Sequence, residues 1–445
     1  MDRSIPGQVQ WLLAQLNTAG FEAYLVGGCV RDLLRFAQPQ DWDICTSALP
    51  EETKACFSGC QVLETGLRHG TVTVLLDHRP YEITTYRADG PYSDGRRPDS
   101  VAFVPDLTED LARRDFTVNA MALGLDGVVR DPFGGREDLE RGLIRCVGDP
   151  DRRFQEDGLR LMRALRFSAT LDYAIEPATG AAIRRNLSML DHVAAERVNV
   201  ELRKLLLGRR RVDVLREYPE VFCRFWPQLE PLVRLAQHNP HHCYGGWEHT
   251  LHALAAAPED LVVRLAVLLH DIGKPSCKTT DEAGVDHFYG HPQAGAELAD
   301  EMLRALKFDN ATRERVVTLV RWHDAPVHLT EKSVRRWLGR LGEEALLQLL
   351  EVKRCDSMGQ DPVLVQDRLA DNAALGELVR DVVAQGQCFA LRDLAVDGRD
   401  LLGLGIPPGP EVGRVLAALL DAVIDQGTPN EKGALLEVAA TMIQK

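Results

Sequence analysis

The stretch Tyr24-Leu25-Val26-Gly27-Gly28-Cys29-Val30-Arg31-Asp32-Leu33-Leu34 decides the fold of the N-terminal part of this chain. The apolar run that ends at Val26 predicts a buried strand, the glycine pair predicts a turn, and the next residues predict a helix with Arg31 in its first turn. Backbone N–H groups at such a junction attract anions, glycine lets a ligand approach closely, and arginine adds a charged fork. A glycine pair alone is most often a simple turn, so the prediction that Gly27, Gly28 and Arg31 bind phosphates depends on neighbouring motifs.

Two aspartates follow in Asp41-Trp42-Asp43-Ile44. Residues two apart on a strand project to the same face, so both carboxylates can converge on hard divalent cations. Glu82 lies on a predicted neighbouring strand and is the candidate third carboxylate. We therefore predict a catalytic site of Asp41, Asp43 and Glu82 that binds Mg²⁺, with one ion activating a hydroxyl and another holding a triphosphate.

The hydrophobic pattern divides the chain into a mixed head and a helical remainder. The head has an amphipathic helix, two strands joined by a hairpin and a Gly turn between apolar segments, at residues 8–19, 71–76, 81–86 and 126–127. From about Arg152 the periodicity is helical almost throughout, and residues 403–413 predict a connector between helices. The expected fold class is α+β, with a mixed sheet in the head.

Composition narrows the cellular setting. The chain has 445 residues, which favours several domains, and its ten cysteines form no CxxC pair. No signal-peptide pattern and no apolar run long enough to span a bilayer is visible, so we expect a cytoplasmic protein without membrane contacts. The net charge of −14 would argue against a polyanionic partner if it were evenly distributed.

One segment is nevertheless basic. Between Arg184 and Arg216 the chain carries nine arginines and lysines against four acidic residues, so this segment is the candidate RNA-binding surface. We select Arg197, Arg203 and Lys204 within it. The alternative reading is an ordinary solvated helix face.

The head motifs together resemble those of the class II CCA-adding enzymes, the tRNA nucleotidyltransferases of the polymerase β-like superfamily, whose head is shared with bacterial poly(A) polymerases. The resemblance rests on residues 25–32, 41–43, 113–121, 153–163 and 196–205, in the family's order. It implies a polymerase β-like nucleotidyltransferase head, CTP, ATP and tRNA as partners, and a role for Arg114, Asp115 and Asn119 in organising the sugar and phosphates of the incoming nucleotide.

The next motif predicts how a base is chosen. Asp157, Arg160 and Arg163 follow each other on one predicted helix face. Asp157 can accept from an exocyclic amino group while Arg160 donates to the adjacent ring nitrogen, which fits cytosine and adenine. Guanine and uracil would leave both groups unpaired, at roughly 1–3 kcal/mol each. Out of context, the same pattern would be a surface ion pair worth about 0.2–0.5 kcal/mol.

Most of the thirteen histidines lie between His238 and His328. This region resembles an HD domain, a helical metal-dependent phosphohydrolase, at Leu268-Leu269-His270-Asp271-Ile272-Gly273-Lys274-Pro275. The resemblance implies a divalent transition metal held by His249, His270, Asp271 and Asp356, with His291 and His323 as additional ligands. Some CCA-adding enzymes carry an HD domain that hydrolyses phosphoesters, including 2′,3′-cyclic phosphates.

The resulting prediction is a head at residues 1–145, an all-α neck at 146–235, an HD domain at 236–358 and a helical tail at 359–445. The expected activity is addition of C, C and A to tRNA 3′ ends without a nucleic-acid template. Alternatives are an A-adding enzyme, a bacterial poly(A) polymerase, an HD phosphohydrolase with a nucleotide-binding head, or an RNA-binding protein with a decayed site. The segment Arg87–Pro98 supplies the loop that CC-adding enzymes lack, which disfavours CC-only addition. The sequence leaves the oligomeric state open.

Overall fold

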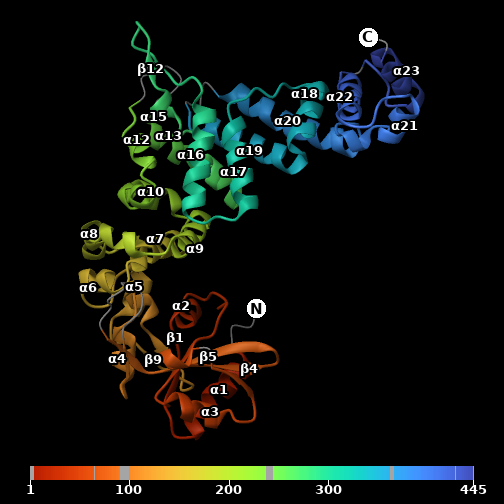
Figure 1. Ribbon diagram of the computed structural model, residues 1–445. Coiled ribbons are helices and arrows are strands. Elements are labelled where there is room, and N and C mark those ends of the chain that lie inside the picture. Colours follow the sequence, from red (N-terminus) through yellow and green to blue (C-terminus); the bar gives the residue numbers. More distant parts are fainter. Residues whose placement is uncertain are drawn as a thin grey trace. The chain divides into compact units, whose positions relative to one another are not determined.

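The computed structural model describes residues 5–64, 66–90, 100–236, 244–360, 365–425 and 427–443. The chain forms two compact units, Met1–Pro227 and Gln228–Lys445 (Figure 1). The predicted head and most of the predicted neck lie in the first unit, and residues 228–235 of the neck lie in the second unit with the predicted HD domain and tail. The division into four domains remains a prediction.

A seven-stranded mixed sheet organises the head, with the order β3-β4-β5-β2-β1-β8-β9. Strand β1 is antiparallel to β2 and β8, whereas β2 is parallel to β5. The mixed sheet predicted from the sequence is therefore confirmed. The strands are β1 (Ala23–Val26), β2 (Ile44–Thr46), β3 (Gln61–Leu63), β4 (Thr71–Leu76), β5 (Arg79–Thr85), β8 (Ala122–Leu123) and β9 (Val129–Arg130).

Helix α1 (Gly7–Thr18) covers the sheet together with α3 (Pro50–Cys56), which lies beside it (Figure 1). The apolar face of α1 is fully buried and packs on the strands, because its leucines and valine recur at helical spacing: Val9, Leu12, Leu13 and Leu16. The predicted hairpin between β4 and β5 turns at Asp77 and His78, which both have positive φ. Its second strand begins at Arg79, earlier than the sequence pattern indicates.

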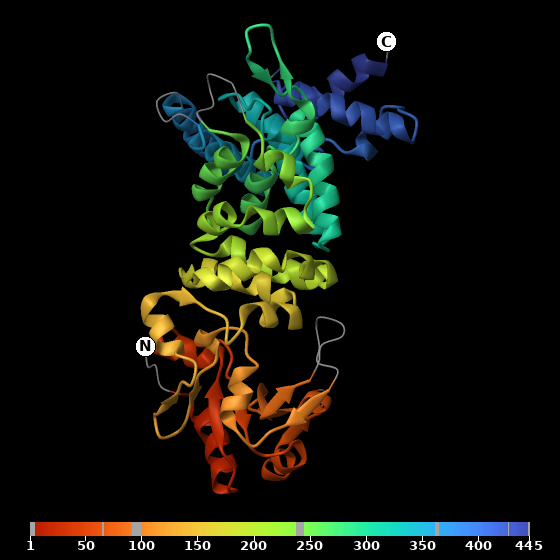
Figure 2. The ribbon, with the colours of Figure 1, turned by 90° about the vertical axis from the view of Figure 1, so that its left-hand side faces the viewer.

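Helices dominate the remainder of the first unit. The core pair is α7 (Leu159–Leu171) and α9 (Ala195–Leu207), which pack side by side (Figure 2). The other helical elements are α2 (Gly28–Leu34), η1 (Leu67–His69), α4 (Leu107–Ala112), η2 (Thr117–Asn119), α5 (Gly135–Arg141), α6 (Pro150–Glu156), α8 (Pro177–Arg185), η3 (Leu187–His192), α10 (Arg211–Glu217) and α11 (Pro219–Phe225). Short strand pairs join β6 (Arg87–Asp89) to β7 (Val101–Phe103) and β10 (Leu143–Ile144) to β11 (Ala174–Ile175). Of these strands, β11 lies in the predicted neck, so the neck is not purely helical.

Within the residues that the structure describes, the second unit is helical apart from one small hairpin, β12 (Thr279–Thr280) with β13 (Asp286–His287). Its centre is α14 (Leu261–Leu269), which is apolar except for the buried Arg264 and packs on α17 (Asn310–Trp322) and α19 (Glu343–Met358). The other helical elements are α12 (Leu229–Val233), α13 (Gly246–Ala255), α15 (Lys274–Cys277), α16 (His291–Ala305), α18 (Glu331–Leu341), α20 (Gln366–Ala384), η4 (Leu391–Asp393), α21 (Gly398–Gly403), α22 (Pro410–Ile424) and α23 (Lys432–Ile443). Among the described helices, none is long and apolar enough to cross a membrane.

Candidate active site

The three predicted carboxylates line one cavity of the head, with a volume of about 680 Å³. Parallel pairing of β2 with β5 sets Ile44 opposite Ile83, so Asp43, directly before β2, and Glu82 of β5 occupy the positions just before this pair. Asp41 and Asp43 lie in the segment that leads into β2, not inside a strand as the sequence predicts. The carbonyl of Asp43 still accepts the N–H of Val26 at 3.0 Å, so the segment continues the sheet at this point.

The charges in this cavity favour a cation. Desolvation raises the pKa of Asp43 above its ordinary value, Arg114 opposes the shift, and the carboxylates of Glu82 and Asp41 add to it. Three carboxylates that repel one another in this way offer oxygen ligands to a hard divalent ion, and such an ion would relieve the repulsion. The donor set therefore fits Mg²⁺.

Glycine is required where the strand β1 turns into α2. Gly27 has φ 81°, and a Cβ atom there would lie 3.3 Å from Arg114 Nη1 and 3.8 Å from Asp43 Oδ2. The turn therefore places Arg114 beside the acidic cavity. Helix α2 has only seven residues, so an anion bound here would depend more on charged side chains than on a helix dipole.

A buried aspartate that the sequence analysis missed holds Arg114. Asp110 is fully buried and contacts Arg114 Nη2 at 3.2 Å and Arg113 Nη2 at 2.9 Å. Burial alone would raise the pKa of Asp110, but the two arginines lower it. The spacing of three and four residues on α4 is the signal that could have identified Asp110.

A continuous chain of hydrogen bonds links α2 to α7. Asn119 Oδ1 accepts from Arg31 Nη1 at 2.7 Å, and Asn119 Nδ2 donates to Asp115 Oδ1 at 3.2 Å. Asp115 Oδ2 in turn accepts from Arg163 Nε at 2.8 Å. The structure thus brings together four residues that the sequence predicts to bind the nucleotide.

Three arginine side chains lie around one aromatic ring next to this chain of hydrogen bonds. The guanidinium groups of Arg31, Arg163 and Arg166 lie 5.2, 5.4 and 3.4 Å from the centroid of Phe167. Glu201 of α9 balances Arg166 through a contact of 2.7 Å. The sequence predicts no role for Arg166 or Glu201, nor for Phe167, because a phenylalanine within an amphipathic helix is usually a core residue.

The predicted base-reading residues adopt a different arrangement from the one that we expected. Asp157 lies in the junction between α6 and α7, in extended conformation, so it does not share a helix face with Arg160 and Arg163. Its carboxylate caps the N–H of Leu159 at 3.0 Å and accepts from Arg197 Nη1 and Nη2 at 3.3 and 2.9 Å. Arg197, predicted to contact RNA, is thus engaged with Asp157.

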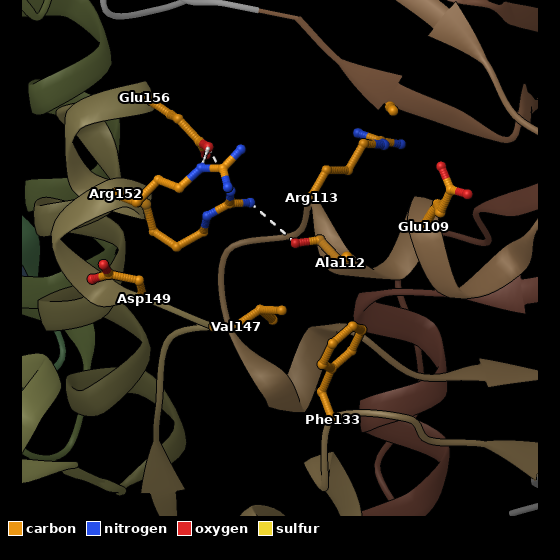
Figure 3. Close-up of a pocket in the computed structure, with 11 residues that line it drawn as sticks. Glu109, Ala112, Arg113, Phe133, Val147, Asp149, Arg152 and Glu156 are labelled. Atoms are coloured by element: carbon orange, nitrogen blue, oxygen red, sulfur yellow. Dashed lines mark hydrogen bonds and ion pairs between the residues drawn. The ribbon is translucent and has the colours of Figure 1, made fainter.

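Arg160 is held from several sides. Its Nη1 contacts Glu156 Oε2 at 2.6 Å, and its Nη2 donates to the carbonyl of Arg113 at 3.1 Å. Glu156 also pairs with Arg152 and Arg153 and lines a cavity of about 370 Å³ (Figure 3). Glu156 therefore fixes Arg160, which is only 8% exposed.

The basic segment is less free than its composition suggests. Arg184 pairs with Glu220, Arg185 with Asp151, and Arg210 and Arg216 with Asp213. On α9, Lys204 is exposed and Arg203 is half-buried. The predicted RNA contacts through Arg203 and Lys204 remain a prediction.

The second unit brings together all six predicted metal ligands. His249 Nε2 lies 2.9 Å from Asp356 Oδ1 and 3.5 Å from Asp271 Oδ2, and His270 Nε2 lies 3.2 Å from the same Asp271 oxygen. The other oxygen of Asp271 lies 3.5 and 3.9 Å from the Nε2 atoms of His291 and His323. Asp271 thus stands between two histidine pairs.

Backbone carbonyls orient the four imidazoles. The Nδ1 atoms of His249, His270, His291 and His323 lie 3.0, 2.7, 2.8 and 2.7 Å from the carbonyls of Gly359, Val267, Phe288 and Val320. Because a carbonyl oxygen only accepts, each Nδ1 carries a proton and each Nε2 faces into the cluster, the orientation found in metal-binding histidines. Burial lowers the pKa of His291, and lowers that of His323 to about 3, so these two rings are neutral near pH 7.

The fold and the head site define a nucleotidyltransferase. Residues 23–145 match the family described as "Poly A polymerase head domain", residues 172–218 match "Probable RNA and SrmB- binding site of polymerase A", and residues 292–439 match tRNA nucleotidyltransferase domain 2. The chain belongs to the family of CCA-adding enzymes. It is 36% identical to the CCA-adding enzyme of Limosilactobacillus fermentum, over 97% of this chain and 96% of that protein.

Other relatives agree with this assignment. The CCA-adding enzyme of Levilactobacillus brevis is 35% identical, over 96% of this chain and 95% of that protein. The crystal structure of the Bacillus stearothermophilus CCA-adding enzyme in complex with CTP matches with a TM-score of 0.68 and 30% identity, covering 98% of each chain. A Thermotoga maritima CCA-adding enzyme complexed with tRNA shares the fold, at 19% identity, a TM-score of 0.61 and coverage of 99% of this chain and 97% of that one.

The buried pair of Asp115 and Arg163 gives a prediction for stability. Burial would raise the pKa of Asp115, but Arg163 and its other partners lower it from 3.8 to about 2. The pair therefore stabilises the fold above pH 3.8, and this contribution, about 2 kcal/mol, is lost as the pH falls through about 2. The difference in free energy of unfolding between the wild type and Asp115→Asn should shrink as the pH is lowered from 5 towards 2, as measured by urea denaturation.

The exposed Glu140→Gln in the same head serves as the control and should show no such pH-dependent difference. A difference for Asp115→Asn that stays constant over this pH range would mean that Asp115 is not a depressed, ion-paired carboxylate.

Proposed function

We propose that this enzyme adds C, C and A to tRNA 3′ ends, using CTP and ATP, in the cytoplasm where tRNA is used. The observation that carries the proposal is the convergence of Asp41, Asp43 and Glu82 on one cavity beside Gly27 and Arg114. The named activity of the relatives, CCA addition, supports it.

The proposed reaction is a nucleotidyl transfer. The terminal 3′-hydroxyl of the RNA attacks the α-phosphorus, a new P–O bond forms, the bond to the β-phosphate breaks, and pyrophosphate leaves. Asp41, Asp43 and Glu82 would hold two Mg²⁺ ions, which supply activation of the hydroxyl and charge neutralisation of the triphosphate. Arg31, Arg114 and Arg163 place positive charge where a triphosphate would lie.

Base selection would use Asp157 and Arg160. Both side chains are fixed by partners, Asp157 by Arg197 and Arg160 by Glu156. A rigid acceptor and donor recognise cytosine and adenine, and they penalise guanine and uracil because no rearrangement can satisfy the unpaired groups. Arg197 thereby serves as a positioning residue for the choice of base.

The alternatives inside the class differ in the nucleotides that are added. A-only addition and poly(A) synthesis use the same carboxylates. The segment on which we based the argument against CC-only addition lies mostly at residues 91–98, outside the described residues. Incorporation of labelled CTP and ATP into tRNA transcripts that end at the discriminator base, at C or at CC separates these activities.

Removal of both aspartates gives the direct test. Asp41→Ala combined with Asp43→Ala should lower incorporation on all three transcripts by at least 1,000-fold, on the order of 4 kcal/mol, because the proposed ions lose two of their three carboxylates. The exposed Glu140→Ala should retain full activity. Incorporation that survives the double substitution would disprove the metal assignment.

Arg197 provides a test of base selection. Arg197→Ala should lower the preference for CTP and ATP over UTP and GTP by about tenfold, because Asp157 loses its bidentate partner. Lys204→Ala, on the same helix, should instead raise the KM for tRNA without changing nucleotide preference. Steady-state kinetics with each nucleotide check both. If Arg197→Ala changed only the KM for tRNA, Arg197 would be a phosphate contact as first predicted.

We also propose that the second unit contains an HD-type metal-dependent phosphohydrolase site. His249, His270, Asp271 and Asp356 would hold one divalent transition metal, and His291 and His323 with the second oxygen of Asp271 offer ligands for another. Such a metal supplies an activated water and polarises a phosphoryl group. The fit is supported by four imidazoles whose Nδ1 atoms all meet carbonyls, which would serve no purpose in a purely apolar core.

Metal analysis tests this second site. The purified protein should contain a transition metal that His270→Ala removes, together with hydrolysis of 2′,3′-cyclic nucleotides, while CCA addition persists as a check of folding. The exposed His328→Ala should keep both metal and hydrolysis. Absence of metal and turnover, with no effect of His270→Ala, would rule out the phosphohydrolase assignment.

A further inference from the structure

The cluster of predicted metal ligands in the second unit reaches solvent at one edge. The side chains of His249, His270, Asp271 and His323 are at most 2% exposed, whereas Asp356 is 27% and His291 11% exposed. A substrate that approaches the cluster must therefore pass Asp356 and His291.

An exposed aromatic side chain lies in the turn that leads into one of these ligands. Tyr289, two residues before His291, is 79% exposed. A large apolar side chain with such exposure loses contact with water favourably when a flat apolar ligand covers it. The turn before His291 thus adds an aromatic face to the polar ligands of the cluster.

The turn that carries Tyr289 is tied to the cluster. The N–H of His291 donates to the carbonyl of Phe288 at 3.2 Å, and His291 Nδ1 meets the same carbonyl at 2.8 Å. Lys274, which contacts Asp271 Oδ2 at 2.7 Å, lies 5.4 Å from the ring centroid of Phe288. Phe288 therefore anchors the turn, and Tyr289 is held at a defined place beside His291.

The Tyr289 ring is already oriented as a platform. It stacks on the His287 ring with centroids 5.4 Å apart and an interplanar angle of 7°. His287 is held in turn by Asp281, whose Oδ2 lies 2.8 Å from Nε2. Aromatic faces presented in this way bind nucleobases with little dependence on base identity.

We propose that Tyr289 stacks on the base of a nucleoside phosphate whose phosphoryl group lies at the metal cluster. This inference rests on the proposed phosphohydrolase function and deepens it, because it names the residue that binds the base of the substrate. In the hydrolysis of a cyclic phosphate, water adds to phosphorus, one P–O bond to the ribose breaks, and the ribose oxygen takes a proton. Tyr289 takes no part in that step and acts on binding alone.

Kinetics of the metal-loaded full chain test the proposal. Tyr289→Ala should raise the KM for adenosine 2′,3′-cyclic phosphate about tenfold with little change in kcat, whereas Tyr289→Trp should keep the KM near the wild-type value. The KM for glycerol 1,2-cyclic phosphate, which has no base, should not change in any variant. Leu391→Ala, which removes another exposed apolar side chain of the same unit, is the control.

Binding without turnover gives a second readout. The 2′,3′-cyclic phosphate of 2-aminopurine riboside should lose fluorescence when it binds the wild-type protein, because stacking quenches this base. A 12-nucleotide RNA that ends in the same fluorescent nucleotide distinguishes a free nucleotide from an RNA end as the source of the ligand. Tyr289→Ala should abolish the quenching of whichever of the two binds.

The outcomes separate the two proposals. An equal rise in KM for the nucleoside and glycerol substrates, or no rise for either, would overturn the stacking role of Tyr289 while hydrolysis itself stood. Quenching that depends on Tyr289 in a protein that hydrolyses neither substrate would support the base platform and overturn the phosphohydrolase function. Absence of both quenching and hydrolysis would overturn both.

Discussion

The parallel pairing of β2 with β5 is the constraint on which the head depends. It brings Asp43, directly before β2, next to Glu82 of β5, although these two strands do not follow each other along the chain. The antiparallel neighbour β1 ends beside them, just before Gly27. The sheet therefore collects three carboxylates at one place without any loop having to fold over them. The free energy that aligns the carboxylates comes from the buried strands and from α1, since carboxylates that repel one another cannot gather by themselves.

Positive charge is arranged around this acidic centre by buried partners. Asp110 holds Arg114, Asp115 holds Arg163, and Phe167 gathers three guanidinium groups against one ring. Each of these partners is largely buried, so the arginines lose little additional conformational freedom when a nucleotide binds. The site can thus oppose a triphosphate with a preformed set of charges.

The same physical principle recurs in the second unit with different chemistry. Four imidazoles are fixed by backbone carbonyls at the ends and faces of packed helices, and a buried aspartate stands between them. The largely apolar α14 is buried in the helical bundle, so its C-terminal end places His270 and the adjacent Asp271 in the interior. In both units, packed apolar strands and helices therefore end at the positions where the polar side chains of the site lie.

The sequence by itself determined the mixed head, the strand, glycine turn and helix at residues 23–34, the hairpin of β4 and β5, and which acidic and histidine residues are candidate metal ligands. These features depend on local periodicity and on motif order, which can be read from neighbouring residues. Only the tertiary structure decided which partner each charged group takes. Asp157 pairs with Arg197, 40 residues away, and Asp115 pairs with Arg163, 48 residues away. Asp271 faces two histidine pairs from four different helical elements. Such pairings depend on how helices pack, because a charged side chain takes the partner that burial leaves within reach.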